Sequence, residues 1–154
     1  MSLTYGLSTV SDLLAKLERD AKNLNDEVTS DQMFNFVVTG YSMIDWIKND
    51  PNVPQTAKTS NEIQALYNDQ WLKVCGDLAT ASKHFTLTRR QPIVTSATSS
   101  RGYGVGRYGK GRFGVGEECI EIELSDGTKY GALDLVKGVL TKWRSFFKQH
   151  GIRR

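Results

Sequence analysis

The segment from residue 71 to residue 85 carries polar side chains whose spacing could do chemistry: Lys73, Asp77, Thr80 and His84. Residues three, four or seven positions apart share one face of a helix, so these side chains form a stripe. A carboxylate, a hydroxyl and an imidazole on one face are groups that transfer protons. The stripe is therefore a candidate catalytic site, with His84 as general base or phosphate contact, Asp77 to orient it and Lys83 to supply charge.

The same residues also fit a structural seam. Asp77 and His84 are two helical turns apart, roughly 10 Å, which is too far for a direct hydrogen bond without bent side chains or a water. No serine or cysteine lies one turn from His84 on its face, although Thr80 does. In this alternative the polar groups bond to neighbouring helices or backbone and fix the register of a bundle. Both interpretations remain open from the sequence.

A second candidate site is the segment 100–116, where seven glycines alternate with four cations and three aromatic residues. Cations bind phosphates, aromatic rings stack on unpaired bases, and glycines allow close backbone approach. The residues assigned to nucleic-acid binding are Arg101, Tyr103, Arg107, Tyr108, Lys110 and Arg112. No strand-to-helix junction or Gly-Lys-Ser/Thr ending follows, so this is not a common nucleotide-binding loop. The alternatives are a solvent-exposed hairpin tip without ligand and a contact to a protein partner.

The charge of the chain is distributed unevenly around a net value of +3. Residues 1–82 carry 11 acids and 6 bases, whereas residues 83–116 carry 7 bases and no acid. Residues 117–154 are nearly balanced, with 7 bases and 6 acids. This asymmetry indicates an anionic partner for the middle of the chain.

The elements that must position these residues follow from apolar periodicity. One-face patterns predict four helices, over residues 8–25, 30–49, 61–85 and 132–149. The third helix would be near 35 Å long at about 1.5 Å per residue. Thr59 and Glu62 have the spacing of a capping box before it, and Thr9 or Ser8 can cap the first helix.

Between the third and fourth helices the period changes from that of a helix to that of a strand. In the segment 119–124 the alternation places Ile120, Ile122 and Leu124 inward and Glu121 and Glu123 outward. With an extended stretch from residue 92 and a turn at 125–128, this predicts an antiparallel β-hairpin over residues 92–130, with 100–116 as its tip. We expect a mainly α fold: a single domain, residues 1–154, in which a four-helix bundle carries a small antiparallel hairpin or sheet between helices 3 and 4.

The totals of the chain fit an ordinary globular protein of 154 residues. No run of about 18 apolar residues exists and the first residues lack a signal-peptide pattern, so we expect no membrane contact. Cys75 and Cys119 are too few for a disulfide framework or a zinc site. A reduced, cytoplasmic protein without a metal or cofactor is expected. Most aromatic residues at helical spacing should be core, and Trp46 is the one expected outside it, on an oligomer face.

Several short motifs together resemble a known group of proteins: Phe34-Asn35-Phe36-Val37-Val38-Thr39, Asp45-Trp46-Ile47, Asp77-Leu78-Ala79 and Ser82-Lys83-His84-Phe85. The chain resembles uncharacterised bacterial and phage proteins whose helices are similar to the HEPN superfamily, over roughly residues 8–85 and the closing helix. This resemblance implies a helical bundle, often a homodimer, tied to nucleic-acid metabolism and defence systems.

In active HEPN members the resemblance implies a metal-independent ribonuclease, built on an arginine, a polar residue and a histidine of one helix. His84 matches the histidine, but residues 75–78, where the arginine could fall, contain none. Arg89 or Arg90 could replace it only if the chain folded back onto the helix. The electrostatic stabilisation that usually dominates such catalysis would otherwise be missing.

Three functions follow from these observations. The leading one is a non-catalytic helical-bundle protein of phage or prophage type that contacts RNA, DNA or a protein through the basic Gly/aromatic hairpin. The first alternative is a HEPN-like ribonuclease using His84 with Asp77 or Lys83. The second alternative is a structural subunit without a ligand.

Overall fold

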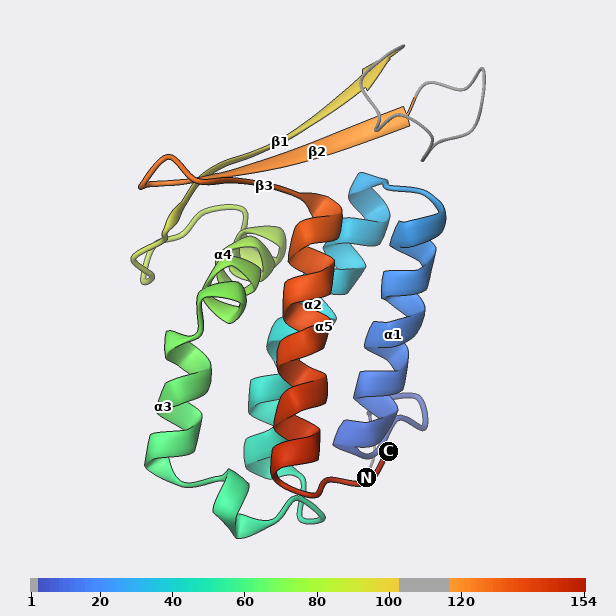
Figure 1. The fold of residues 1–154 in the computed structure, drawn as a ribbon, viewed down its shortest axis with the longest axis vertical. Coiled ribbons are helices and arrows are strands. Elements are labelled where there is room, and N and C mark those ends of the chain that lie inside the picture. The colour runs from blue at the N-terminus through green and yellow to red at the C-terminus, as the bar shows by residue number, and fades with distance from the viewer. Residues whose placement is uncertain (1–2, 103–116) are drawn as a thin grey trace.

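The computed structural model describes residues 3–102 and 117–154. In this part of the chain the protein is mainly helical with a small antiparallel sheet, which confirms the predicted fold class at that level (Figure 1). The elements in chain order are α1 (Val10–Asp26), α2 (Ser30–Asn49), the short 3-10 helix η1 (Gln55–Ala57), α3 (Ser60–Asn68), α4 (Gln70–His84), β1 (Val94–Gly102), β2 (Glu117–Leu124), β3 (Lys129–Gly131) and α5 (Ala132–Gln149).

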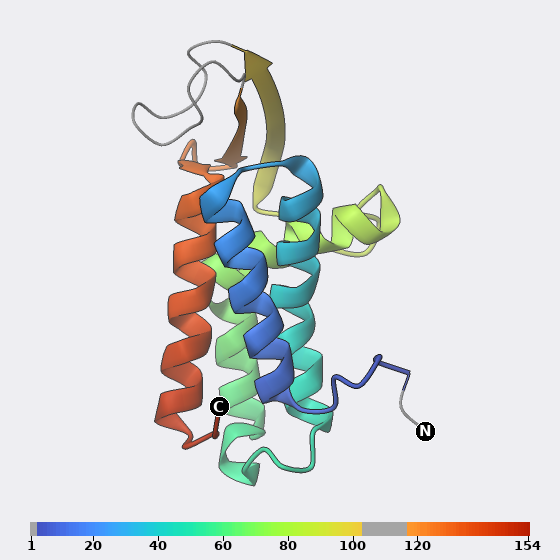
Figure 2. The same cartoon turned by 90° about the vertical axis from the view of Figure 1, so that its right-hand side faces the viewer.

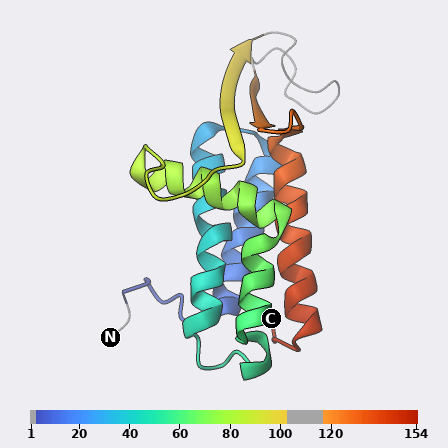
Figure 3. The same cartoon turned by 90° about the vertical axis from the view of Figure 1, so that its left-hand side faces the viewer.

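Helices α1, α2, α3 and α5 run along the long axis of the molecule, and α4 crosses them near the end that carries the sheet (Figures 1 and 3). Their apolar faces meet in one core, whose largest fully buried side chains include Trp143, Phe36 and Phe147. The indole N–H of Trp143 donates to the carbonyl oxygen of Gly40 at 3.0 Å, so this buried polar atom is satisfied. The start of α1 and the C-terminal end of the chain lie at the end of the bundle away from the sheet (Figure 1).

The prediction of one helix over residues 61–85 is wrong, because Asp69 divides this stretch into α3 and α4. Asp69 has an extended backbone, and its carboxylate accepts a hydrogen bond from the Leu72 N–H at 3.1 Å. Asp is a strong N-cap residue, so a new helix starts here in a new direction. The turn lets Trp71 pack against Gly138 of α5, where an added Cβ would lie 2.2 Å from the ring. The described residues thus contain five α-helices instead of four.

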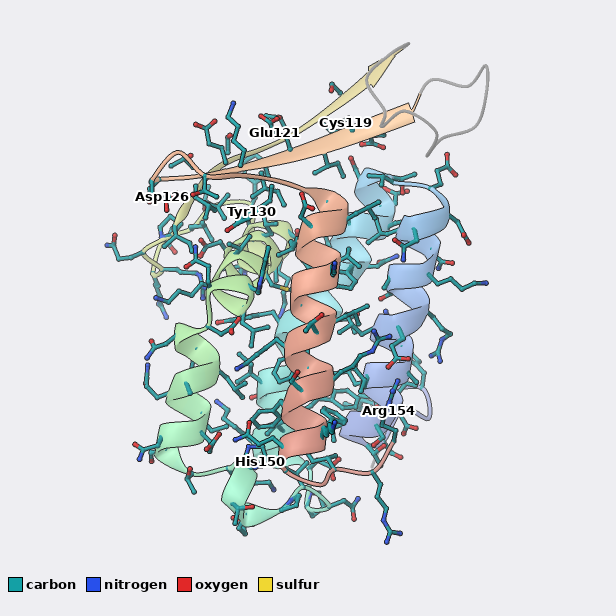
Figure 4. The ribbon with its side chains drawn as sticks, viewed as in Figure 1. Cys119, Glu121, Asp126, Tyr130, His150 and Arg154 are labelled. Atoms are coloured by element: carbon teal, nitrogen blue, oxygen red, sulfur yellow. The ribbon has the colours of Figure 1, made fainter. Side chains whose placement is uncertain are left out.

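The predicted capping of the helices is confirmed in part. Thr9 caps α1 in a reciprocal box with Asp12, as the sequence allowed. Thr59 accepts a hydrogen bond from the Glu62 N–H, but the expected return bond from the Glu62 side chain does not appear among the contacts of the described residues. The Glu62 carboxylate instead lies 3.2 Å from the ring of His150, at the end of α5 (Figure 4 labels His150). This tertiary contact competes with the local one.

The aromatic residues pack largely as predicted, except that the exposed member of the set is Phe34 and not Trp46. Phe36 and Trp143 are fully buried, and Trp46 is half-buried against the core. Trp46 is therefore not the exposed aromatic of this set. Phe34, near the start of α2, takes that place with 48% exposure. The helical period gave the correct buried face but not the depth of each position, which depends on neighbouring helices.

The three strands form a sheet in the order β1-β2-β3, antiparallel throughout. The inward side chains of β2 are buried as the alternation predicted: Ile120, Ile122 and Leu124. Glu121 is exposed on the opposite face, away from the helices, as Figure 4 shows. The sheet therefore rests on the helices by one face of β2, and β1 lies at its edge.

Candidate functional site

Asp77, the carboxylate of the predicted stripe, is held inside the fold. It lies on α4 and is only 3% exposed. One carboxylate oxygen, Oδ2, accepts hydrogen bonds from the backbone N–H groups of Ile93 and Val94, at 2.7 and 3.0 Å. The other oxygen, Oδ1, accepts a hydrogen bond from the Arg90 Nε at 2.5 Å. Asp77 thereby fastens the start of β1 to α4.

Arg90 is the residue that folds back onto α4. Besides Asp77, its guanidinium donates to the Tyr41 hydroxyl at 2.9 Å and to the Lys73 carbonyl oxygen at 3.1 Å. It also lies 5.2 Å from the centre of the Tyr41 ring, in cation–π distance. Burial opposes the charged form of Arg90, but the hydrogen bonds to Asp77 and Tyr41 outweigh it, and the pKa of Arg90 is raised.

Gly76 makes room for this arrangement. A Cβ atom at Gly76 would lie 2.5 Å from the Tyr41 ring and 2.6 Å from a guanidinium nitrogen of Arg90. Any side chain at this position would therefore push both groups away from α4. Gly76, Asp77, Arg90 and Tyr41 form one unit, which we call the lower anchor of the hairpin.

A second carboxylate fastens the other end of the hairpin. Glu118, at the start of β2, is 8% exposed and reaches the N-terminus of α2. It accepts hydrogen bonds from the Ser30 N–H at 3.1 Å and from the Ser30 hydroxyl. The hydroxyl of Ser99 on β1 donates to it as well. A carboxylate is favourable at a helix N-terminus, where N–H groups point outward. Glu118, Ser30 and Ser99 form the upper anchor.

The structure separates the predicted catalytic residues. Asp77 is buried in the lower anchor, whereas Lys83 and His84 are exposed at the C-terminal end of α4. Thr80, between them, donates its hydroxyl to the Gly76 carbonyl oxygen at 2.7 Å. The stripe exists along α4, but the hydrogen bonds of Asp77 that the structure shows are made to the lower anchor.

Cys75, beside the stripe, is enclosed by the core. Its thiol lies 3.4 Å from the Val37 carbonyl oxygen, between α2 and α4. Burial raises the pKa of Cys75 to about 12, against a small opposing effect of Arg90. The thiol is therefore protonated at neutral pH, whereas the thiolate is the nucleophilic form.

The predicted nucleic-acid contacts fall mostly beyond the described part of the chain. Tyr103, Arg107, Tyr108, Lys110 and Arg112 lie outside the described residues. The backbone of Arg101 belongs to β1 and pairs opposite Glu118. What the structure does give is the base of the hairpin on which these residues are carried.

Sequence reasoning missed the two anchors. Glu118 was visible only as one acid in a strand, and no local pattern joins it to Ser30, 88 positions away. The sequence leaves open whether the chain after α4 folds back to bring Arg89 or Arg90 onto the helix, and the structure shows that Arg90 does so. No local pattern marks this return, because the partners of Arg90 lie 13 to 49 positions away along the chain.

Within residues 3–102 and 117–154, no group of three or more His, Cys, Asp or Glu side chains could hold a metal ion. No helix in the same ranges has the length and apolar character needed to cross a membrane. Comparison with known proteins gives no match to a family model, to a curated protein or to a solved structure. The resemblance to the HEPN superfamily therefore stays a prediction.

Proposed function

We propose that the protein is a non-catalytic nucleic-acid-binding protein whose β-hairpin is the contact arm. The observation that carries the proposal is the pair of anchors: Asp77 fastens the start of β1 to α4, and Glu118 fastens β1 and β2 to α2. An arm held at both points is positioned by rigid elements, which lowers the entropy lost on binding.

The charge of the arm supports an anionic partner. From residue 83 to residue 116 the sequence has seven bases and no acid. Of these bases, Arg90 is used in the lower anchor, whereas Lys83 and Arg89 are exposed. Outside this basic segment, Glu121 and Glu123 alternate outward on β2, opposite Thr98 and Ser96 of β1, and Glu121 pairs with Lys129 at 3.6 Å.

The test is the salt dependence of binding. Changing Arg107, Lys110 and Arg112 together to alanine should weaken binding of single-stranded RNA. It should also flatten the slope of log K against log salt by about 2, since each lost phosphate contact removes about 0.7. The measurement is fluorescence anisotropy over a salt series.

A matched variant controls for total charge. The control residues are exposed cations on helices with no ion pair among the described contacts: Arg19, Lys22 and Lys148. Their triple alanine variant also removes three positive charges. It should retain both affinity and slope. Wild-type protein that shows no salt-dependent binding of RNA or DNA would contradict the proposed function.

A further inference from the structure

The chain between α4 and β1 forms a projection on the side of the molecule. We call these residues, 85–93, the connector, and they extend outward from the end of α4 (Figures 2 and 3). It is fixed at both ends, because the Phe85 N–H donates to the Ala81 carbonyl oxygen at 2.8 Å and Arg90 is held in the lower anchor. The connector is thus a supported projection.

Phe85, the first residue of the connector, has a strained backbone conformation. Its backbone has φ +66° and ψ −42°, and the Thr86 N–H closes a γ-turn to the His84 carbonyl oxygen at 2.7 Å. Positive φ is rare for a bulky residue, and this form of the γ-turn is strained. The side chain is 92% exposed, so the ring gains no burial in return. Strain without benefit to folding points to a role in binding.

Cations flank the ring on both sides in sequence. Lys83 and Arg89 are exposed, as are Thr86 and Thr88, whose hydroxyls can bond phosphate oxygens. The sequence has no acid between Asp77 and Glu117, and Asp77 is paired with Arg90. An exposed ring beside cations is the combination that binds unpaired bases and their phosphates.

Tyr5 shows that exposure alone is not the argument. It is also fully exposed and also has positive φ, at +55°. Yet residues 3–12 contain no cation and one acid, Asp12. Charge therefore distinguishes the surroundings of Phe85 from those of Tyr5, and it makes Tyr5 a matched control.

We infer that Phe85, with Lys83 and Arg89, forms a stacking contact for an unpaired base of a single-stranded nucleic acid. Along the chain, this contact is separated from the segment 103–116 by β1, an edge strand of the sheet. The inference deepens the proposed function, on which it rests, by selecting single strands over duplexes. In a duplex the base faces are stacked on one another and cannot meet the ring.

The experiment compares Phe85→Ala with wild-type protein, using a labelled oligouridylate of about 12 nucleotides, within the site sizes of single-strand binders. The expected result is a loss of affinity of about tenfold or more, the size of one stacked base. Binding of inorganic polyphosphate, which has no bases, should stay unchanged. The double variant Lys83→Ala, Arg89→Ala should weaken binding of both probes.

Two variants separate binding from folding. Phe85→Gly should bind oligouridylate as poorly as Phe85→Ala while its melting temperature stays equal or rises, because glycine adopts positive φ without strain. Phe85→Trp should keep the affinity, since it keeps a stacking ring. Tyr5→Ala should bind as the wild type does.

Several outcomes would overturn the inference. Phe85→Ala could bind oligouridylate as tightly as the wild type does, or it could lose as much affinity for polyphosphate as for oligouridylate. The wild type could also bind a duplex as tightly as a single strand, or it could bind polyglutamate and not oligouridylate. If Phe85→Ala fails to matter but the Arg107, Lys110, Arg112 variant loses binding, the inference falls and the proposed function stands. The reverse pattern removes the hairpin tip from the proposed function and keeps the Phe85 contact. Wild-type protein that binds no nucleic acid overturns both.

Discussion

At the scale of single residues, the polar stripe of α4 divides into a buried part and an exposed part. Asp77 accepts three hydrogen bonds within the fold, from Arg90 and from two backbone N–H groups. His84 lies exposed at the end of the same helix. A change at Asp77 should therefore be measured by its effect on stability, and a change at His84 by its effect on RNA cleavage.

Asp77→Asn should lower the free energy of unfolding by about 2 kcal/mol. The change leaves the charge of Arg90 without its carboxylate partner. The expected loss is smaller than for a fully buried ion pair because the Arg90 side chain is 25% exposed to solvent. His84→Ala should change it by less than about 0.5 kcal/mol, as is usual for an exposed residue. Urea unfolding followed by circular dichroism measures both.

The same pair tests the ribonuclease alternative. Arg90 lies back on α4, which favours that alternative in position, but its nitrogen atoms are engaged by Asp77, Tyr41 and the Lys73 carbonyl. We expect no metal-independent RNA cleavage by the wild type. Cleavage that His84→Ala abolishes at unchanged stability would reverse this conclusion and assign the exposed end of α4 to catalysis.

At the scale of elements, the break at Asp69 decides the shape of the protein. It turns α4 across the bundle, so that α4 supplies both the lower anchor and the base of the connector. The crossing depends on close contact between Trp71 of α4 and Gly138 of α5. Trp71 also packs on Tyr130 of β3, with ring centroids 4.8 Å apart. One aromatic residue thus joins helix, helix and sheet.

Gly138→Ala should destabilise the protein by about 1–3 kcal/mol. Helix propensity alone favours alanine over glycine by about 1 kcal/mol. The added Cβ, however, would lie 2.2 Å from the Trp71 ring, and overpacking of this kind outweighs the gain. Lys137→Ala, at the exposed neighbouring position, is the control and should be nearly neutral. A melting temperature that rises in Gly138→Ala would show that α4 can move without loss.

At the scale of the whole molecule, the protein is a helical bundle that carries the β-hairpin arm at one end of the bundle, where two anchors hold the arm. The start of α1 and the C-terminal end of the chain lie at the end of the bundle opposite the sheet (Figure 1). The two anchors join segments that are far apart in sequence: Arg90 to Tyr41 across 49 positions and Glu118 to Ser30 across 88. The orientation of the arm is therefore a property of the assembled fold.

Glu118→Gln should loosen the arm without unfolding the helices. The variant removes a negative charge that stabilises the N-terminus of α2 by about 1 kcal/mol. It also weakens the hydrogen bond from the Ser99 hydroxyl. Amide hydrogen exchange in β1 and β2 should become faster while that of α1 and α5 stays the same. Glu121→Gln is the control, because its exposed pair with Lys129 is worth little. Equal acceleration in all elements would argue against a separately anchored arm.

The sequence by itself determined the features that depend on near neighbours. Periodicity placed α1, α2, α5 and the buried face of β2, and Thr9 was available as a cap because capping is a contact across three residues. The same periodicity joined α3 to α4, because the apolar face continues through Asp69. The break requires both the N-cap of Asp69, a local contact, and the packing of Trp71 on Gly138, a distant one.

Only the tertiary structure decided what the candidate residues do. Asp77 and His84 looked alike on one helical face, yet one is covered by the returning chain and the other is not. Phe85 carried the period of a core residue, and the end of α4 left it in solvent. Burial and hydrogen bonding of a side chain depend on which distant segments arrive beside it, and a helical period holds no information about that.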